Sequence, residues 1–303
     1  MSQAPLSACI LAIGDEIVYS STVLPAFYEQ RGFRPAWLTE RGATPQADSL
    51  LKMLREAPNE GLRTADYHYT RMERVVRSIR GAVGTIDYRE WADLDLLLTD
   101  AFLIYGAHLV GGRLDPLTIQ SGWYAVRREV DLQRVLERAL VSGTVAQALR
   151  DLLPAHRGYH TLRTGLARYR TIEARGGWRS IPAGSTLRPG DRDARIRLLR
   201  ARLVDAGDLE TATAADPELY DAALAEVVRH YQDRHGLEPD GIIGPATIAE
   251  LNTTVQQRID RLEVNLERWR WLPQRLGDRH ILVNIAAFDM RVIEGEREAV
   301  RMR

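Results

Sequence analysis

The stretch that decides the fold of this chain is Tyr231–Asn252, which reads YQDRHGLEPDGIIGPATIAELN. It overlaps a longer segment, Pro217–Arg234, in which apolar side chains recur at the three- and four-residue spacing of an amphipathic helix. Gly236 follows at the position where helices commonly end in the left-handed conformation, and Leu237 is placed to pack back on the last turn. The pattern therefore predicts a helix over 217–234 that a glycine stops.

The remainder of the stretch predicts a tight turn and a second, short helix. Pro239-Asp240-Gly241 combines three residues that favour turns. Gly244-Pro245 then opens the next helix, because proline at the first helical position loses no hydrogen bond. Upstream, Asp191–Gly207 carries one apolar row and predicts a preceding helix, with the aspartate as its N-cap and the glycine as its stop.

The motifs of this region resemble those of the small peptidoglycan-binding domain that accompanies many cell-wall enzymes. Gln-x-x-x-Gly-Leu begins at Gln232, Asp-Gly-x-x-Gly at Asp240 and x-Thr-x-x-x-Leu-Asn at Ala246. The resemblance implies a small three-helix domain over 186–252 with peptidoglycan as its partner. Caps and turns explain the individual residues, so the binding function rests on the resemblance. The exposed turn after the 217–234 helix supplies the candidate ligand-binding side chains, which are Tyr231, Arg234, His235 and Asp240.

Composition indicates a globular protein and excludes several function classes. The 303 residues suffice for two or three domains, and apolar and charged fractions of 45% and 27% are ordinary. Lys+Arg and Asp+Glu balance at 41 each, which argues against a general nucleic-acid or anionic-membrane binder. Lys52 is the only lysine, so nearly all the cations are arginine. We see no apolar run that approaches the length of a transmembrane segment.

Cysteine and histidine are too sparse to predict a disulfide or a metal site. Cys9 is the only cysteine, and no basic segment precedes it as in a lipoprotein signal. His156 and His160 have the i, i+4 spacing that suits zinc on one helix face. However, Pro154 interrupts the segment before them and no glutamate lies between them. We therefore predict no metal site and no cofactor.

The segment from Val23 to Ala183 predicts helices joined by short loops. Tyr88–His108 carries the most regular apolar face, which includes Trp91, Phe102 and Tyr105. Another amphipathic helix is predicted from Asn252 to about Trp271. Further helices are predicted to begin at Pro25 and to cover 47–57, 131–140, 144–153 and 159–174.

Several clusters resemble the N-terminal scaffold domain of the large periplasmic murein L,D-transpeptidases. They include Arg34-Pro35-Ala36-Trp37, Gly112-Arg113-Leu114-Asp115-Pro116 and Gly177-Trp178, in the order found in that family. Asn265–Pro273 resembles the segment that leads into its catalytic domain. The resemblance implies a mainly α protein in the periplasm. Its parts would be an N-terminal tail over 1–20, a helical scaffold domain over 21–185, the peptidoglycan-binding domain over 186–252, and a linker helix with first catalytic strands over 253–303.

The end of the sequence predicts β-structure. Ile281–Ile285 has the pattern of a strand, and apolar and polar residues alternate from Phe288 to Ile293. A turn at Glu294–Glu296 then leads to a returning strand over 299–302. Because a lone hairpin is marginally stable in water, we expect an incomplete β-hairpin of a truncated catalytic domain.

The resemblance also defines a chemistry that these residues lack. An L,D-transpeptidase cross-links stem peptides by acyl transfer through a cysteine thiolate that a histidine activates. In the family those groups follow the first catalytic strands, whereas Cys9 lies in the wrong region. We therefore assign no catalytic residue and expect this chain to be inactive alone. Two alternatives stay open, namely a standalone non-catalytic peptidoglycan-binding protein, and the binding region of another cell-wall enzyme such as an amidase or lytic transglycosylase.

Overall fold

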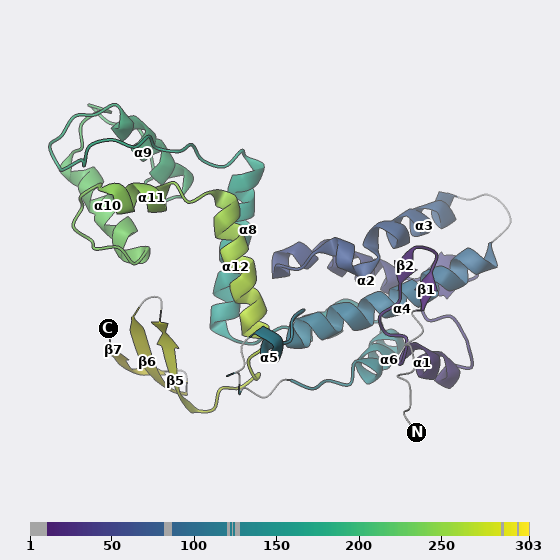
Figure 1. Ribbon diagram of the computed structural model, residues 1–303. Helices are drawn as coiled ribbons and strands as arrows, with labels where there is room; N and C mark the ends of the chain where they lie inside the picture. The colour runs from purple at the N-terminus through teal and green to yellow at the C-terminus, as the bar shows by residue number, and fades with distance from the viewer. Residues whose placement is uncertain are drawn as a thin grey trace, which may run out of the picture. The chain divides into compact units, whose positions relative to one another are not determined.

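The computed structural model describes residues 11–81, 87–119, 122, 124, 128–285, 288–295 and 297–302. The described chain is mainly α, as predicted (Figure 1). It divides into two compact units, the first made of residues 1–163 and 263–274 and the second of 164–262 and 275–303. Cys9 and Glu296, which the sequence analysis discussed, lie outside the described residues.

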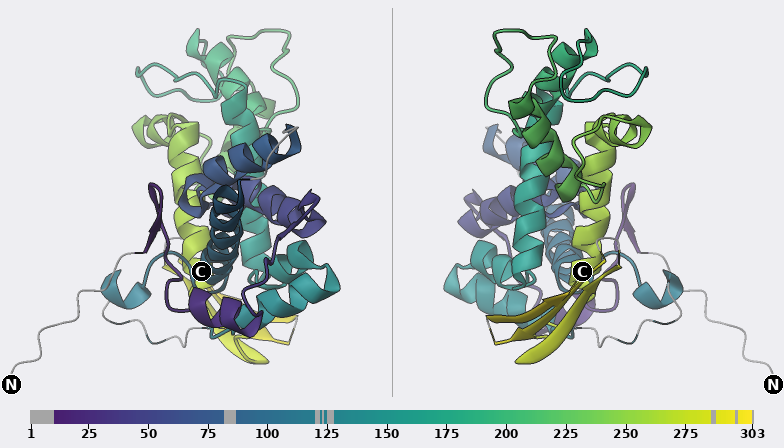
Figure 2. Two further views of the ribbon diagram at one scale, coloured as in Figure 1. Left: turned by 90° about the vertical axis from the view of Figure 1, so that its right-hand side faces the viewer. Right: turned by 90° about the vertical axis from the view of Figure 1, so that its left-hand side faces the viewer.

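The first unit is built around α4, Tyr88–Gly111. The Asp87 side chain caps this helix by accepting hydrogen bonds from the N–H groups of Arg89 and Glu90 at 3.0 and 3.2 Å. Four helices, α1, α2, α3 and α6, pack against α4, and Figure 2 shows it among them. The other helices of this unit are α1 (Leu24–Gln30), α2 (Pro45–Arg55), α3 (Tyr69–Gly81), α5 (Pro116–Ile119), α6 (Leu132–Ser142) and α7 (Val145–Asp151).

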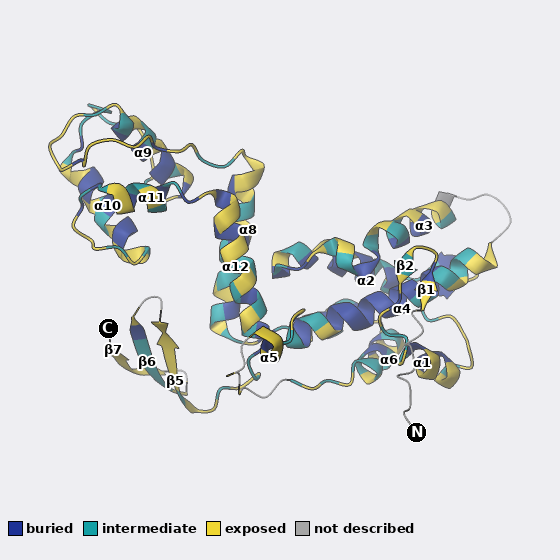
Figure 3. Cartoon of the chain, in the orientation of Figure 1, coloured by how far each residue is buried: buried dark blue, intermediate teal, exposed yellow. Residues whose placement is uncertain are grey.

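The core helix α4 is long and apolar enough to cross a membrane, which corrects the sequence-based expectation that no apolar run approaches that length. However, 72% of the apolar stretch of this helix is buried inside the protein. Figure 3 shows the middle of α4 mostly in dark blue, whereas its first turns are teal and yellow. A helix that is apolar on nearly all sides belongs either in a protein core or in a bilayer, and its burial here fits the former.

Short elements that the sequence analysis did not predict connect these helices. Residues 11–20, within the predicted N-terminal tail, form a hairpin whose Ile13 and Val18 are buried in the core of the first unit. Two 3₁₀ turns and α3 were also not predicted. The short elements are β1 (Ala12–Ile13), β2 (Glu16–Ile17), β3 (Leu38–Thr39), β4 (Gly42–Ala43), η1 (Ala57–Glu60) and η2 (Thr64–Tyr67).

A buried aspartate of α4, Asp95, holds the loop that contains one of the sequence clusters. Its carboxylate accepts hydrogen bonds from the N–H groups of Ala36 and Trp37 at 2.9 and 2.8 Å. The hydroxyl of Tyr28 donates to it at 2.6 Å. Burial raises the pKa of Asp95, although these hydrogen bonds act in the opposite direction. The Arg34–Trp37 cluster is thus fixed to the central helix by backbone contacts.

A second buried aspartate of α4, Asp100, holds the N-terminal hairpin together with His68. Its carboxylate accepts from the N–H of Ser20 at 2.6 Å and lies 2.9 Å from Nε2 of His68. The other ring nitrogen of His68, Nδ1, lies 2.7 Å from a carboxylate oxygen of Glu16. Burial alone would lower the pKa of His68, but the hydrogen bonds to Asp100 and Glu16 outweigh it and raise the pKa.

The second unit contains the predicted three-helix domain, made of α9 (Arg195–Asp205), α10 (Ala222–Arg234) and α11 (Pro245–Leu251). Its core includes Ile196, Leu203, Leu224 and Val228. Two further helices contribute residues to both units, and these are α8 (Arg157–Ala174) and α12 (Val255–Arg270).

Both long helices of this domain begin later than predicted. The α10 helix begins at Ala222 because Asp221 caps it, accepting from the N–H of Leu224 at 2.8 Å. The N–H of the preceding Tyr220 donates instead to the carbonyl of Asp191 at 2.9 Å. Asp191 is consequently not the N-cap of α9, since its carboxylate accepts from a residue before it in a turn. The residues before α9 and those before α10 are therefore extended and pair with each other, as in the antiparallel bridge between Arg192 and Leu219.

The C-terminal segment forms the predicted strands as one antiparallel sheet. Its order is β5 (Arg279–Asn284), β6 (Asp289–Glu294) and β7 (Arg297–Met302). Asp289 links the strands by pairing with Arg291 at 2.6 Å and with Arg301 at 2.7 Å. Many apolar side chains of the segment are exposed, as Figure 3 shows in yellow, and they include Ile281, Val283, Ile285, Phe288, Val300 and Met302.

Candidate functional site

The α10 helix, which carries most of the candidate site residues, ends in a motif built on a left-handed glycine. Gly236 is left-handed, with a φ of 72°. The N–H of Leu237 donates to the carbonyl of Gln232 at 2.9 Å, and the N–H of Gly236 donates to that of Asp233 at 3.2 Å. The predicted stop is therefore confirmed, as is the predicted start of α11 at Pro245.

The turn between α10 and α11 is organised by a buried amide, that of Gln232. Its nitrogen lies 3.0 Å from Oδ1 of Asp240, 3.0 Å from the carbonyl of Ile242 and 3.2 Å from Oγ1 of Thr247. Its oxygen accepts from the N–H of Gly241 at 2.8 Å. Gln232 belongs to the Gln-x-x-x-Gly-Leu motif, from which no role for its side chain was predicted. A glutamine on the buried stripe of a helix was the available signal, because buried amides need partners.

Three of the four predicted ligand-binding side chains lie together at the end of α10. The ring of His235 lies over that of Tyr231, with centroids 4.1 Å apart. The guanidinium of Arg234 lies 5.9 Å from the Tyr231 ring and forms an ion pair with Asp208 at 2.6 Å. Tyr231 is only 2% exposed, and burial raises its pKa to about 12. Among the three, Arg234 is the side chain that solvent reaches, being 51% exposed.

The fourth predicted residue, Asp240, is engaged within the turn. Its Oδ1 accepts hydrogen bonds from the amide of Gln232 at 3.0 Å and from the N–H of Ile242 at 2.7 Å. This is the geometry of an aspartate that stabilises its own turn. Its replacement would therefore disturb the fold of the turn as well as any ligand contact.

A charged cluster behind these residues keeps His235 neutral. Its Nδ1 lies 3.2 Å from Nη1 of Arg258 and 3.0 Å from Oε1 of Glu250, and the latter two pair with each other at 2.6 Å. Burial and, after it, the charge of Arg258 lower the pKa of His235 to about 4. At neutral pH its contact with Glu250 is therefore not an ion pair. Sequence reasoning missed Arg258 because it belongs to the following helix.

The Gly177-Trp178 cluster packs against the three-helix domain. The indole N–H of Trp178 donates to the carbonyl of Thr253 at 3.1 Å, and the guanidinium of Arg202 lies 3.5 Å from the indole centroid. The side chain of Asn252 donates to the carbonyl of Ile181 at 2.9 Å and accepts from its N–H at 2.8 Å. This cluster therefore attaches the loop before the three-helix domain to that domain.

The first unit contains a cleft of about 400 Å³ whose buried acid is already neutralised. The carboxylate of Glu60 lies 2.6 Å from Nε of Arg163 and accepts from the hydroxyl of Tyr159 at 2.8 Å. Arg270 donates to the backbone carbonyl of the same glutamate. The charged residues that line this cleft are three acids, Glu56, Glu60 and Asp151, and two arginines, Arg150 and Arg163.

His156, the first residue of the histidine pair with zinc-compatible spacing, packs within the first unit. Nε2 of His156 lies 2.8 Å from the carbonyl of Pro273, and its ring lies 5.2 Å from that of Trp269. In the ranges that the structure describes, no group of three or more His, Cys, Asp or Glu side chains has the arrangement of a metal site.

Comparison with known families gives two matches in the order that the motifs predicted. Residues 22–166 match a family described as a scaffold domain. Residues 192–251, which contain Tyr231, Arg234, His235 and Asp240, match a family described as a putative peptidoglycan binding domain. The second match supports peptidoglycan as a partner and association with the cell wall.

One curated relative is also a cell-wall protein. The chain is 41% identical over 75 residues to N-acetylmuramoyl-L-alanine amidase CwlM of Mycobacterium tuberculosis (strain ATCC 25618 / H37Rv). The alignment covers 22% of this chain and 18% of that protein. The chain thus spans about a fifth of the length of the curated relative it matches. The similarity supports a cell-wall role, and the L,D-transpeptidase assignment stays a prediction.

Proposed function

We propose that this chain belongs to a periplasmic cell-wall protein of the L,D-transpeptidase type, and that residues 192–251 hold it on peptidoglycan. The observation that carries the proposal is the ordered pair of matches, a scaffold domain followed by a peptidoglycan-binding domain. The clusters at Arg34–Trp37, Gly112–Pro116 and Gly177-Trp178 support the transpeptidase type, because they occur in that family's order.

On the binding domain, the exposed guanidinium of Arg234 is the group best placed to contact the ligand. The stem peptides of peptidoglycan carry carboxylates, and a guanidinium binds a carboxylate through two parallel hydrogen bonds. The guanidinium of Arg234 lies near the buried ring of Tyr231, against which the half-buried ring of His235 also packs. Asp240 would contribute indirectly, because its hydrogen bonds stabilise the turn between α10 and α11.

Sedimentation of the full chain with purified sacculi tests the binding proposal. Arg234→Gln is expected to weaken binding about fivefold, the effect of losing one partly exposed charge contact. Arg192→Gln is the matched control, because Arg192 is also an exposed arginine that pairs with an aspartate, Asp216. Failure of the unmodified chain to sediment would reject peptidoglycan binding. Normal sedimentation of folded Arg234→Gln protein would reject only this contact surface.

The amidase relative favours a second candidate function, that of the binding region of an amidase. The two classes yield different products, since an amidase releases stem peptides from the glycan and a transpeptidase joins stems. Because Cys9 is the only cysteine and lies far from the family's catalytic segment, we expect no new cross-links from these 303 residues. Mass spectrometry of muropeptides after incubation measures both. Released stems would favour the amidase, and new cross-links would contradict the assigned absence of catalytic residues.

A further inference from the structure

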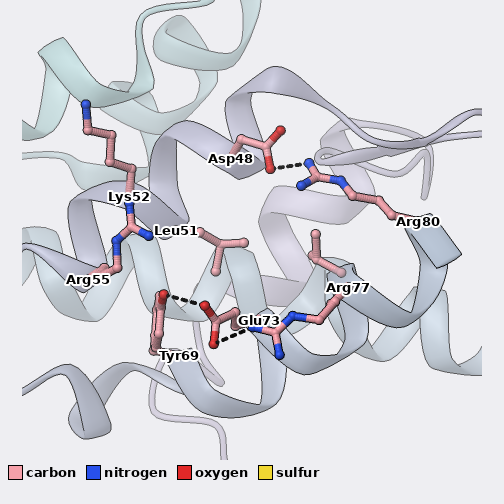
Figure 4. A pocket seen from close by; sticks show the side chains of 9 residues that line it. Asp48, Leu51, Lys52, Arg55, Tyr69, Glu73, Arg77 and Arg80 are labelled. Carbon is pink, nitrogen blue, oxygen red and sulfur yellow. Dashed lines mark hydrogen bonds and ion pairs between the residues drawn. The ribbon is translucent and has the colours of Figure 1, made fainter.

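A second cleft of the first unit has an unbalanced charge. It encloses about 350 Å³ between α2 and α3. Its base is apolar, because Leu51 and Val76 are only 8% and 3% exposed. Figure 4 shows polar side chains around this base, and they are Asp48, Lys52, Arg55, Tyr69, Glu73, Arg77 and Arg80.

The two carboxylates of this cleft are already engaged. Asp48 pairs with Arg80 across the cleft, from α2 to α3. Glu73 accepts a hydrogen bond from the hydroxyl of Tyr69 at 3.0 Å and pairs with Arg77 at 3.4 Å. Burial and then this hydrogen bond raise the pKa of Tyr69, so that its hydroxyl remains protonated at neutral pH. Figure 4 shows these two groups on different sides of the cleft.

The remaining two cations, Lys52 and Arg55, lie on a third side (Figure 4). Within the part of the chain that the structure describes, neither forms an ion pair. Four cations and two carboxylates line the cleft, which leaves two positive charges, although Figure 4 shows the side chain of Lys52 extended away from the others. The cleft lined by Glu60 differs in this respect, since three carboxylates and two arginines line it, which leaves one negative charge. The excess of positive charge therefore distinguishes the α2–α3 cleft from the other cleft of similar volume.

We propose that the α2–α3 cleft binds a short peptide through a free carboxylate, with Arg55 and Lys52 as its cationic partners. The apolar base of Leu51 and Val76 would receive an aliphatic side chain next to that carboxylate. A volume near 350 Å³ lies at the small end of ligand sites, so it fits one or two residues of a peptide.

The inference rests on the proposed function, because the stem peptides of peptidoglycan provide both a carboxylate and aliphatic side chains. Asp48 and Glu73 also line the cleft, so a single carboxylate meets less repulsion there than a doubly charged phosphate. They can also attract an amine on the same peptide. The first unit would then bind peptidoglycan through residues other than 192–251.

The test measures binding of a soluble stem tetrapeptide to the full chain by isothermal titration calorimetry. The double variant Lys52→Gln with Arg55→Gln is expected to bind at least about tenfold more weakly. Raising the salt concentration from 50 to 500 mM is expected to weaken binding by the unmodified chain. Arg74→Gln is the matched control, since Arg74 is exposed on α3, does not line the cleft and forms no ion pair with any described residue.

Two further probes separate the possible sources of negative charge. The same tetrapeptide with amidated carboxylates is expected to lose binding, and inorganic phosphate is expected to bind more weakly than the free peptide. Phosphate that binds more tightly, and is lost in the double variant, would overturn the peptide assignment. Unchanged tetrapeptide binding by a folded double variant would overturn the site itself.

The sacculus experiment keeps the two proposals distinguishable. If the chain sediments with sacculi but does not bind the tetrapeptide, only the α2–α3 cleft inference fails. If the tetrapeptide binds through Lys52 and Arg55 while sacculi are not retained, the proposed role of residues 192–251 fails and the cleft stands. The Lys52/Arg55 double variant and the Arg74→Gln control both replace exposed side chains, so we expect little change in the free energy of unfolding.

Discussion

The two units use different chemistry to hold their loops. In the first unit, Asp95 and Asp100 accept hydrogen bonds from residues 58 and 80 positions away in the sequence. In the second, the neutral amide of Gln232 holds a turn ten positions away. Both arrangements satisfy buried backbone groups, which would otherwise destabilise the fold. A buried carboxylate also responds to pH and is more costly to leave unpartnered, so the first unit should be the more sensitive to mutation and to pH.

The largest expected effect comes from removing the carboxylate of Asp95. Asp95→Ala leaves the N–H groups of Ala36 and Trp37 and the hydroxyl of Tyr28 without their acceptor. We expect the free energy of unfolding of the first unit to fall by about 4 kcal/mol, because several buried polar groups lose their partner together. Hydrogen exchange measured by mass spectrometry reports the loss separately for each unit.

A neutral isostere sharpens this test. Because burial raises the pKa of Asp95, the site already disfavours the negative charge. Asp95→Asn keeps one oxygen for the two N–H groups and gains a donor for the Tyr28 oxygen. We expect it to cost less than half as much as Asp95→Ala. An equal loss for the two variants would show that the negative charge, not the hydrogen bonding, holds the loop.

The next effect concerns the neutral network of the binding domain. Gln232→Ala removes the acceptor of the Gly241 N–H and the donor to Asp240, Ile242 and Thr247. We expect a loss of about 2 to 3 kcal/mol in the second unit, and faster exchange of the 236–244 amides. Gln232→Glu is the matched variant, since it keeps the acceptor and replaces the donor with a charge. Unchanged protection in both variants would contradict the role assigned to this amide.

The smallest effect is a dependence of stability on pH in the first unit. The pKa of His68 is raised in the folded state, so its stabilisation is complete below the unfolded value of about 6.5. It is lost as the pH rises through the folded pKa. We expect a loss of about 1.5 kcal/mol across this window, the value of one charge-assisted hydrogen bond. Urea unfolding at pH 6 and at pH 9 measures it.

The variant His68→Gln provides the comparison for that experiment. In this variant we expect the free energy of unfolding of the first unit to depend less on pH. We expect the pH dependence of the second unit to stay as it is in the unmodified chain. The side chains that hydrogen-bond to the amide of Gln232 are the carboxylate of Asp240 and the hydroxyl of Thr247, and neither is a histidine. A pH dependence of equal size in both units would break the contrast drawn between them.

Some residues of the fold and site could be predicted because their information is local. The glycine at 236 and the proline at 245 restrict the backbone wherever they occur, so the end of α10 and the start of α11 followed from them. The start of α10 could not be predicted as readily. The helical spacing of apolar residues continues through Tyr220, and only its contact with Asp191 shows that this part is extended.

The candidate site shows the same division. Tyr231, Arg234 and His235 could be grouped by sequence because they lie within one turn and a half of α10. That His235 is neutral, and that Asp240 is engaged by Gln232, depends on neighbours from other elements. The excess charge of the α2–α3 cleft likewise appears only when two helices are placed together.

The sequence by itself determined most of the longer helices, the stop of α10 at Gly236 and the order of a scaffold region and a peptidoglycan-binding region, because periodicity, caps and motifs act over a few residues. Only the tertiary structure decided which polar side chains are buried and with whom they pair. The partners of Asp95, Asp100 and Arg258 lie far away in the sequence or on other helices. The energetics of a buried polar group depend on such partners, and a local pattern does not contain them.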